Sequence, residues 1–203
     1  VTVTGVDEGI VDGNQTSTIT VTIDDANSDD DFDAVADQTV AATTTDDDVA
    51  GFTVTETDGS TEVDESGTTD TFTVVLTAQP ASDVVLTVTA DANDEASIAP
   101  SSVSFTPANW DTPQTVTVTG VDESLVDGDQ VSTITVAVLD QASDSNFIDA
   151  PDQTISVSTS DDDTAGFTVT ETDGATEVAE SGTTDTFTVV LDAQPTSDVV
   201  LTI

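Results

Sequence analysis

The chain repeats itself with a period of 115 residues. When residues 1–88 are aligned on residues 116–203 without gaps, 62 of the 88 positions are identical, about 70%, which is typical of tandem arrays. The period divides the chain into the C-terminal part of one repeat (1–50), a complete repeat (51–165) and the N-terminal part of the next repeat (166–203). The folded unit must therefore be about 115 residues long and must be able to adjoin a similar unit at each end.

The complete repeat has the pattern of an all-β protein. Its apolar and polar side chains alternate in short runs rich in Val, Ile and Thr, and Gly, Pro, Asn and Asp separate the runs. No segment has a helical period. We predict about seven strands, at 51–56 with 61–63, 70–76, 83–90, 102–105, 114–120, 131–138 and 153–158. This number of short antiparallel strands per repeat indicates tandem immunoglobulin-like β-sandwiches.

Every compensating charge must come from solution, because the chain has 42 Asp and Glu and no Lys, Arg or His. Two carboxylates about 4 Å apart repel by roughly 1 kcal/mol in bulk water and about 4 kcal/mol near a protein surface. Nucleic-acid binding is excluded because it requires basic groups, and we expect no direct membrane contact for the same reason. Cysteine is absent, which excludes disulfides and thiolate metal sites.

The acidic residues fall where several strands should end together. If successive strands run in opposite directions, the 64–69 turn, the 91–101 loop, the 121–130 loop and the end of the last strand share one pole. Carboxylates from separate loops, without nitrogen or sulfur donors, favour calcium. We therefore expect calcium at the pole that adjoins the next repeat, where it would stiffen the junction. The acids at this pole are Asp64, Glu65, Asp91, Asp94, Glu95, Asp122, Glu123, Asp127, Asp129, Asp161, Asp162 and Asp163.

A simpler interpretation is that the acids are a solvated surface, as in a halophilic protein. We favour this interpretation for the 139–152 loop at the opposite pole, which carries Asp140, Asp144, Asp149 and Asp152. The copies differ there: Asp30 and Asp31 correspond to Ser145 and Asn146.

Four motifs resemble the Calx-beta domain, which occurs in sodium–calcium exchangers and, as tandem copies, in bacterial surface proteins. They are VDESG (63–67), SVSFTPANWDTPQTVTVTGVDE (102–123), DGDQ (127–130) and DDD (161–163). The resemblance covers each repeat and implies a seven-stranded sandwich that binds several calcium ions at one pole. The tandem array is also similar to the extender regions of large calcium-dependent bacterial adhesins. The implied metal ligands are Asp7, Glu8, Asp12, Asp46, Asp47, Asp48, Glu65, Asp91 or Asp94, Asp122, Glu123, Asp127, Asp161, Asp162, Asp163 and Glu180.

These features favour a structural protein over an enzyme. We expect a calcium-rigidified stalk or filament of an adhesin, at the cell surface or outside the cell. Its partners should be neighbouring repeats of the same protein, and we expect self-assembly into a fibre. The alternative is a calcium-dependent carbohydrate-binding module, which would need an exposed aromatic side chain near the metal. Trp110, the single tryptophan, should instead anchor a loop at the far pole. Catalytic triads need His or Lys, so only carboxylate pairs remain for an enzyme.

Overall fold

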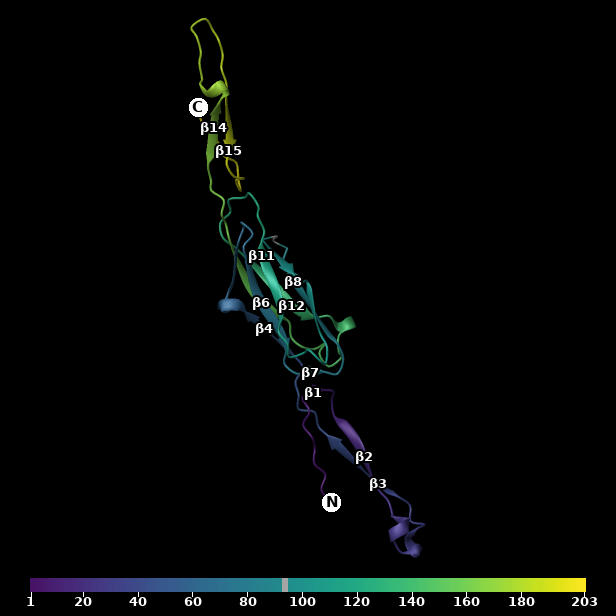
Figure 1. Cartoon of the computed structure of the whole chain (residues 1–203). Helices are drawn as coiled ribbons and strands as arrows, with labels where there is room; N and C mark the ends of the chain where they lie inside the picture. The colour runs from purple at the N-terminus through teal and green to yellow at the C-terminus, as the bar shows by residue number, and fades with distance from the viewer. Residues whose placement is uncertain (93–94) are drawn as a thin grey trace.

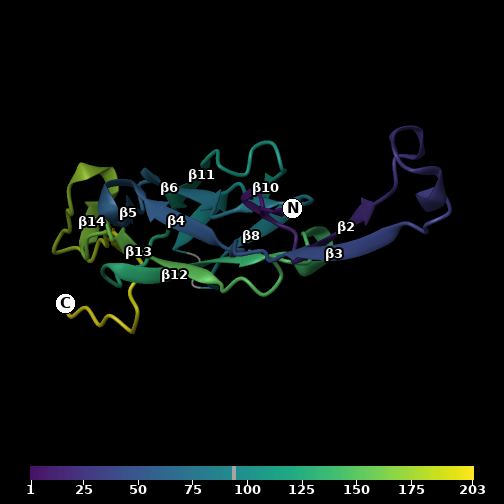
Figure 2. The same ribbon diagram turned by 90° about the horizontal axis from the view of Figure 1, so that it is seen from below.

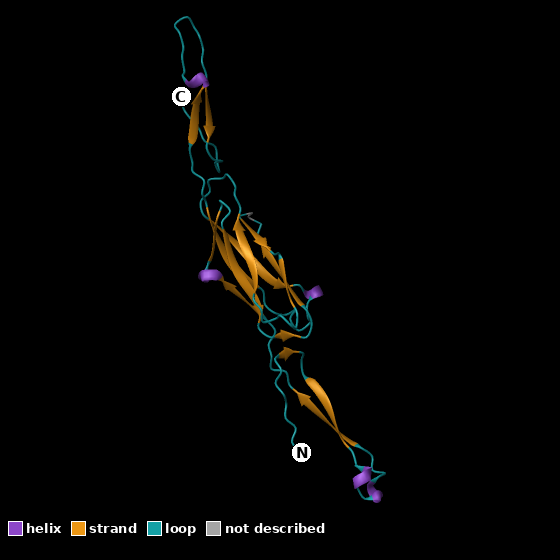
Figure 3. Ribbon diagram, in the orientation of Figure 1, coloured by secondary structure: helices purple, strands orange, loops and turns teal. Residues whose placement is uncertain are grey.

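The computed structural model describes residues 1–92 and 95–203. The described chain is built from strands and loops, and its helices are three-residue 3₁₀ turns (Figure 3). These turns are Asp25–Asn27, Asp30–Phe32, Thr57–Gly59, Asp140–Ala142 and Thr172–Gly174. None of the described helices has the length and apolar character needed to cross a membrane. The expected all-β fold is confirmed.

Residues 52–160 form two facing sheets, which together make the central sandwich (Figure 1). The four-stranded sheet has the order β4 (Phe52–Glu56), β6 (Thr69–Leu76), β11 (Gln114–Gly120) and β9 (Ala96–Ala99). The five-stranded sheet has the order β10 (Ser102–Phe105), β8 (Val84–Ala90), β12 (Gln130–Val138), β13 (Gln153–Ser160) and β5 (Thr61–Asp64). Neighbouring strands are antiparallel except β5 and β13, which are parallel.

The apolar residues of the alternating runs fill the space between the two sheets. Since successive side chains of a strand point to opposite faces, one face of each run is buried. Burial of this apolar surface contributes about 25 cal/mol per Å² and stabilises the sandwich. The fully buried side chains include Phe72, Val74, Val116 and Val118 from one sheet, Leu86, Val88, Ile134 and Val136 from the other, and Phe105 and Phe147.

The structure differs from the prediction at two places, where it adds one strand and divides another between the sheets. The residues before the predicted strand at 102–105 were expected to be a loop, but the structure has β9 there. β9 pairs with β11, whereas β10 pairs with β8. The predicted first strand, 51–56 with 61–63, is divided between the sheets, because β4 pairs with β6 and β5 pairs with β13. The prediction of a loop at β9 was therefore wrong. The strand was missed because its four residues, ASIA, are too few to show a clear apolar alternation.

A hairpin extends from each end of the central sandwich, so the molecule is elongated (Figures 1 and 2). β2 (Gln15–Val21) pairs with β3 (Gln38–Thr44), and β14 (Phe167–Glu171) pairs with β15 (Phe187–Leu191). Their registers match pairs in the sandwich at a shift of 115 residues: Gln15 opposite Thr44 corresponds to Gln130 opposite Thr159. Two short strands, β1 (Ile10–Val11) and β7 (Gln79–Pro80), lie between the N-terminal hairpin and the sandwich.

Candidate metal centre

Three strands that end together build an acidic pole on the central sandwich. β5 and β13 are parallel, with Asp64 opposite Ser160, and the Glu65 N–H donates to the Ser160 carbonyl at 3.2 Å. The end of β11 passes so close that a Cβ on Gly120 would lie 2.1 Å from the Asp64 carbonyl oxygen. Only glycine permits this approach. The segments that follow these strands, beginning at residues 65, 121 and 161, are therefore neighbours.

Five carboxylates converge at this pole, and we name them the C-terminal acidic site: Glu65, Glu123, Asp127, Asp161 and Asp163. One oxygen each of Glu65, Asp161 and Asp163 lie within 4.8 Å of one another, and the same holds for Glu65, Glu123 and Asp127. Calcium binds oxygen ligands at about 2.3–2.6 Å, which places ligands on opposite sides of one ion roughly 5 Å apart. Each triad therefore has the dimensions of a cation site, and Glu65 belongs to both.

Glu65 is the most unusual group in the site because its side chain is 0% exposed and neither carboxylate oxygen has a hydrogen-bond partner. Burial raises the pKa of Glu65 to about 7, with further repulsion from Asp161, Glu123, Glu95 and Asp127. A buried carboxylate without donors is costly unless a positive charge compensates it. The chain has no basic side chain to do so.

Other members of the site share this lack of donors. Glu123 Oε1, Asp127 Oδ1 and Asp163 Oδ2 are buried and have no hydrogen-bond partner. Burial, followed by repulsion from Asp127, raises the pKa of Glu123. Burial, followed by repulsion from Asp161, raises the pKa of Asp163. Orphaned oxygens on three separate segments therefore face a common space, and this is the arrangement that a bound cation would satisfy.

The first aspartate of each DDD run organises the loop around its site. The carboxylate of Asp161 accepts hydrogen bonds from the Gly128 N–H at 2.7 Å and the Asp163 N–H at 2.8 Å. In the preceding copy, Asp46 accepts from the Gly13 N–H at 2.6 Å and the Asp48 N–H at 2.9 Å. The bonds from Asp48 and Gly13 lower the pKa of Asp46 and keep it charged.

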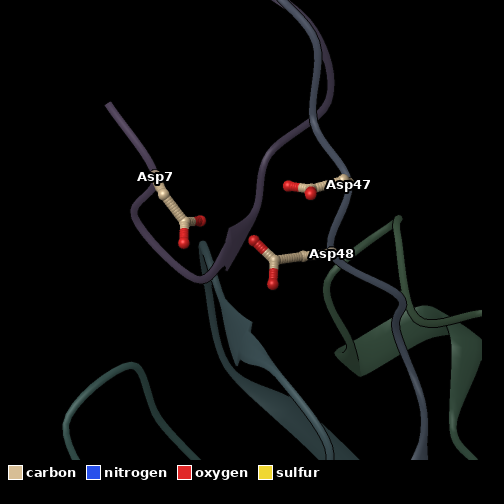
Figure 4. Close-up of side chains that lie close together, drawn as sticks. All are labelled: Asp7, Asp47 and Asp48. Atoms are coloured by element: carbon tan, nitrogen blue, oxygen red, sulfur yellow. The ribbon is translucent and has the colours of Figure 1, made fainter. Parts of the chain in front are cut away.

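The equivalent region of the preceding copy is the N-terminal acidic site, formed by Asp7, Asp47 and Asp48. Their carboxylate oxygens lie within 4.8 Å of one another and point into one space (Figure 4). Burial, followed by repulsion from Asp46 and Asp47, raises the pKa of Asp48. Glu8, Asp12 and Asp46 line the same small cavity. Both ends of the sandwich therefore adjoin an acidic cluster.

The structure divides the residues implied by the Calx-beta resemblance into three groups. It brings together Asp7, Asp47, Asp48, Glu65, Glu123, Asp127, Asp161 and Asp163. It places Glu8, Asp12, Asp46, Asp122 and Asp162 beside these clusters. It separates Asp91, whose exposed carboxylate accepts from the Thr133 N–H at 2.7 Å, and Glu180, which is exposed near the C-terminus. Asp94 lies outside the described residues.

Two acidic residues have roles that the sequence did not indicate. Glu95 was expected at the acidic pole but was not among the implied ligands; it is buried and close enough to raise the pKa of Glu65. Asp144 was expected on a solvated surface, but its side chain is only 4% exposed. It accepts from the Ser82 N–H at 2.8 Å and the Asn146 N–H at 3.0 Å. The solvated interpretation was wrong for Asp144, which fastens two loops together.

No protein-family model matches the chain, and no curated protein matches it. Among solved structures, it is similar to domains 1–6 of the surface layer protein SbsC at 15% identity, over 88% of this chain and 25% of that chain, with a TM-score of 0.41. It is also similar to the E. coli chaperone DraB at 10% identity, over 55% of each chain, with a TM-score of 0.39. The Caenorhabditis elegans MSP-domain-like protein SSP-19 aligns at 19% identity, over 50% of this chain and 92% of that chain, with a TM-score of 0.33.

At these TM-scores and identities, none of the three likenesses carries an argument about function. The Calx-beta resemblance therefore rests on the sequence motifs. What the site can do follows from its own chemistry, which is that of a set of oxygen ligands without a compensating charge.

The raised pKa of Glu65 predicts a pH dependence of stability in the absence of divalent cations. Its ordinary pKa is 4.5 and its folded pKa is about 7, so between these values the folded state holds the proton more tightly. The contribution of protonated Glu65 to the free energy of unfolding is therefore fully present below pH 4.5 and is lost as the pH rises through 7. We expect the melting temperature in chelator to fall between pH 5 and pH 7.5, and to fall less in Glu65→Gln. Parallel pH profiles for the two proteins would contradict this assignment.

Proposed function

We propose that the chain is part of a calcium-rigidified structural protein, a stalk or filament of an adhesin or surface fibre outside the cell, and that it is not an enzyme. The observation that carries this proposal is Glu65. Its two buried oxygens have no partner, and it is the member shared by two acidic triads at the end of the sandwich that adjoins the next copy. A cation there would remove a repulsion that no side chain of this protein can remove.

The ligand set favours calcium over other metals. All available ligands are oxygens from carboxylates and backbone, which suits hard cations, whereas zinc and copper prefer nitrogen and sulfur. Magnesium demands near-ideal octahedral geometry and retains several waters, so a crowded set of carboxylates favours the larger ion. Extracellular calcium modules bind with dissociation constants of about 10⁻⁴–10⁻³ M, and we expect affinities in this range.

The position of the sites supports a mechanical role. Acidic clusters adjoin both ends of the sandwich. At these ends the chain passes to the neighbouring copies (Figure 1). Without cations the like charges repel and weaken the connection; with cations the same groups join the ends of β5 and β13 to the 121–127 loop. The partners of the repeat are then the neighbouring repeats, and a fibre is the natural assembly of such units.

A carbohydrate-binding module is the second candidate, and the position of Trp110 disfavours it. This side chain is half-buried and packs against the hydrophobic core. Its carbonyl accepts from the Leu76 N–H at 3.2 Å, which fixes it beside the start of β11, whereas the C-terminal acidic site adjoins the end of that strand. The only indole of the chain is thus unavailable for stacking on a sugar bound by that site.

Titration calorimetry of the full chain tests the proposal. We expect calcium to bind with a dissociation constant near the 10⁻⁴–10⁻³ M range of extracellular modules, and magnesium to bind more weakly. At pH 7 binding should release protons, because Glu65 is partly protonated there. The measured heat should therefore change with the ionisation enthalpy of the buffer. Absence of calcium uptake would refute the proposed function.

A further inference from the structure

A two-residue parallel ladder connects the N-terminal segment to the central sandwich. In β1 and β7, Ile10 lies opposite Gln79 and Val11 lies opposite Pro80. The Gln79 N–H also donates to the Gly9 carbonyl at 3.2 Å. Figure 1 shows this pair of strands between the sandwich and the N-terminal hairpin. The partner strands belong to consecutive copies of the repeat.

The side chain of Val11 enters the sandwich of the following copy. Val11 is 7% exposed and belongs to the same buried hydrophobic cluster as the core of the sandwich. The Val11 carbonyl accepts a hydrogen bond of 2.8 Å from the Asn146 side chain. Asn146 is itself held in place, because its N–H donates to Asp144, which also binds the Ser82 N–H. The receiving surface is therefore preformed by two loops that are fastened to each other.

The same contact recurs 115 residues later. Leu125 and Gln194 form a parallel bridge. The Val126 N–H donates to the Gln194 carbonyl at 3.0 Å, and the Gln194 N–H donates to the Ser124 carbonyl at 2.6 Å. These residues are the counterparts of Ile10, Gln79, Val11 and Gly9. The contact between consecutive copies, which we call the joint, is therefore present at both junctions of the chain.

We propose that residues 9–11 and 124–126 are docking strands, through which each repeat binds a preformed surface on the repeat that follows it. The partner is the next copy of the same repeat, at the turn 79–82 and the side chain at position 146. The contacts are backbone hydrogen bonds, one amide and one apolar side chain, and none of them uses a carboxylate of the N-terminal acidic site. Repeats held in this way have a fixed orientation instead of the relative motion that is usual between domains.

The residue at position 146 sets the strength of the joint. Asn146 has an N–H₂ group to donate, whereas its counterpart in the preceding copy, Asp31, is an acceptor when ionised and has no hydrogen to give to a carbonyl. A joint received by a copy with aspartate at this position loses one hydrogen bond and gains repulsion between oxygens. The residue at this position of the receiving loop would therefore set the strength of a joint, with asparagine stronger than aspartate.

Amide hydrogen exchange of the full chain, measured by NMR, tests the docking strand. In the wild-type protein the Gln79 and Gln194 amides should both be protected, since each donates across a joint. In Val11→Asn and in Asn146→Asp, exchange at Gln79 should become at least about tenfold faster. Exchange at Gln194, in the unaltered joint of the same molecule, should not change. The Val88 amide, which donates to Ser101 within the sandwich, reports whether the sandwich itself remains intact.

Asp31→Asn is the matched control, because it makes the reverse substitution at an exposed residue that contacts no preceding copy in this chain. It should leave Gln79 unchanged. The measurements are made in excess calcium and in chelator. Unprotected Gln79 in the wild-type protein, or unaltered exchange in both variants, would overturn the docking strand. Protection that depends on Val11 but not on calcium would leave the docking strand standing even if the calcium proposal failed.

Discussion

Saturating calcium should raise the melting temperature of the full chain by at least about 10 °C over its value in chelator. A ligand that binds only the folded state at 100 times its dissociation constant adds about 2.7 kcal/mol per site. For a domain of this size 1 kcal/mol corresponds to roughly 4 °C. Calcium should also relieve the repulsion within the C-terminal acidic site, where Asp161, Glu123 and Asp127 add to the effect of burial in raising the pKa of Glu65. Circular dichroism or calorimetry measures the shift.

The control for this experiment is sodium chloride at matched ionic strength, since salt alone screens repulsion between exposed charges. We expect sodium to produce a much smaller shift, because it does not bind a set of buried carboxylates as calcium does. An equal shift in sodium would show that the acids are a solvated surface. Magnesium should give an intermediate result.

Glu65→Gln should have opposite effects in the two conditions. In chelator at pH 7.5 we expect the variant to melt several degrees higher than the wild type, because it removes a buried charge without changing the shape of the side chain. In calcium it should lose most of the calcium-dependent shift, because Glu65 is the ligand that both triads share. The difference between the two melting curves, with and without calcium, should therefore be much smaller than in the wild type, with the remainder due to the N-terminal acidic site.

Glu180→Gln is the matched control, since Glu180 is the counterpart of Glu65 in the next copy and is exposed in this chain. It should leave both melting temperatures close to those of the wild type. If Glu65→Gln kept the full calcium shift, the triads would not be the calcium sites. If it melted lower in both conditions, Glu65 would have a packing role instead.

The sequence allowed the prediction of the sandwich and of its acidic pole, because both depend on local patterns. Alternation in the run 70–76 places Phe72, Val74 and Leu76 on one face, and all three are buried. Strand direction follows from short turns, and this alone brings Glu65, Glu123 and Asp161 to one end. No knowledge of which strands are paired was needed for that step.

The remaining features depend on contacts between distant segments, which no local pattern records. Glu95 and Asp144 carry the same side chains as exposed residues such as Glu62 and Asp140, and only the packing around them decides that they are buried. In each DDD run the first aspartate accepts a hydrogen bond from a glycine N–H, Gly13 or Gly128, that lies more than 30 residues away in the chain. The sequence of the run alone does not distinguish this aspartate from the other two. The docking strand at Ile10 and Val11 is too short to give a periodic signal.

The parallel pair of β5 and β13 has a consequence for a fibre under tension. The chain enters the sandwich just before β4 and leaves it just after β13, at opposite poles (Figure 1). A pulling force therefore drives β5 and β13 in opposite directions along their length. Their backbone hydrogen bonds, from Thr61 opposite Val157 to Asp64 opposite Ser160, are sheared together and cannot open one at a time. The next residues beyond this ladder are Glu65 and Asp161. A calcium ion bound by both carboxylates would therefore cross-link the two strands at the end of the ladder that resists the force.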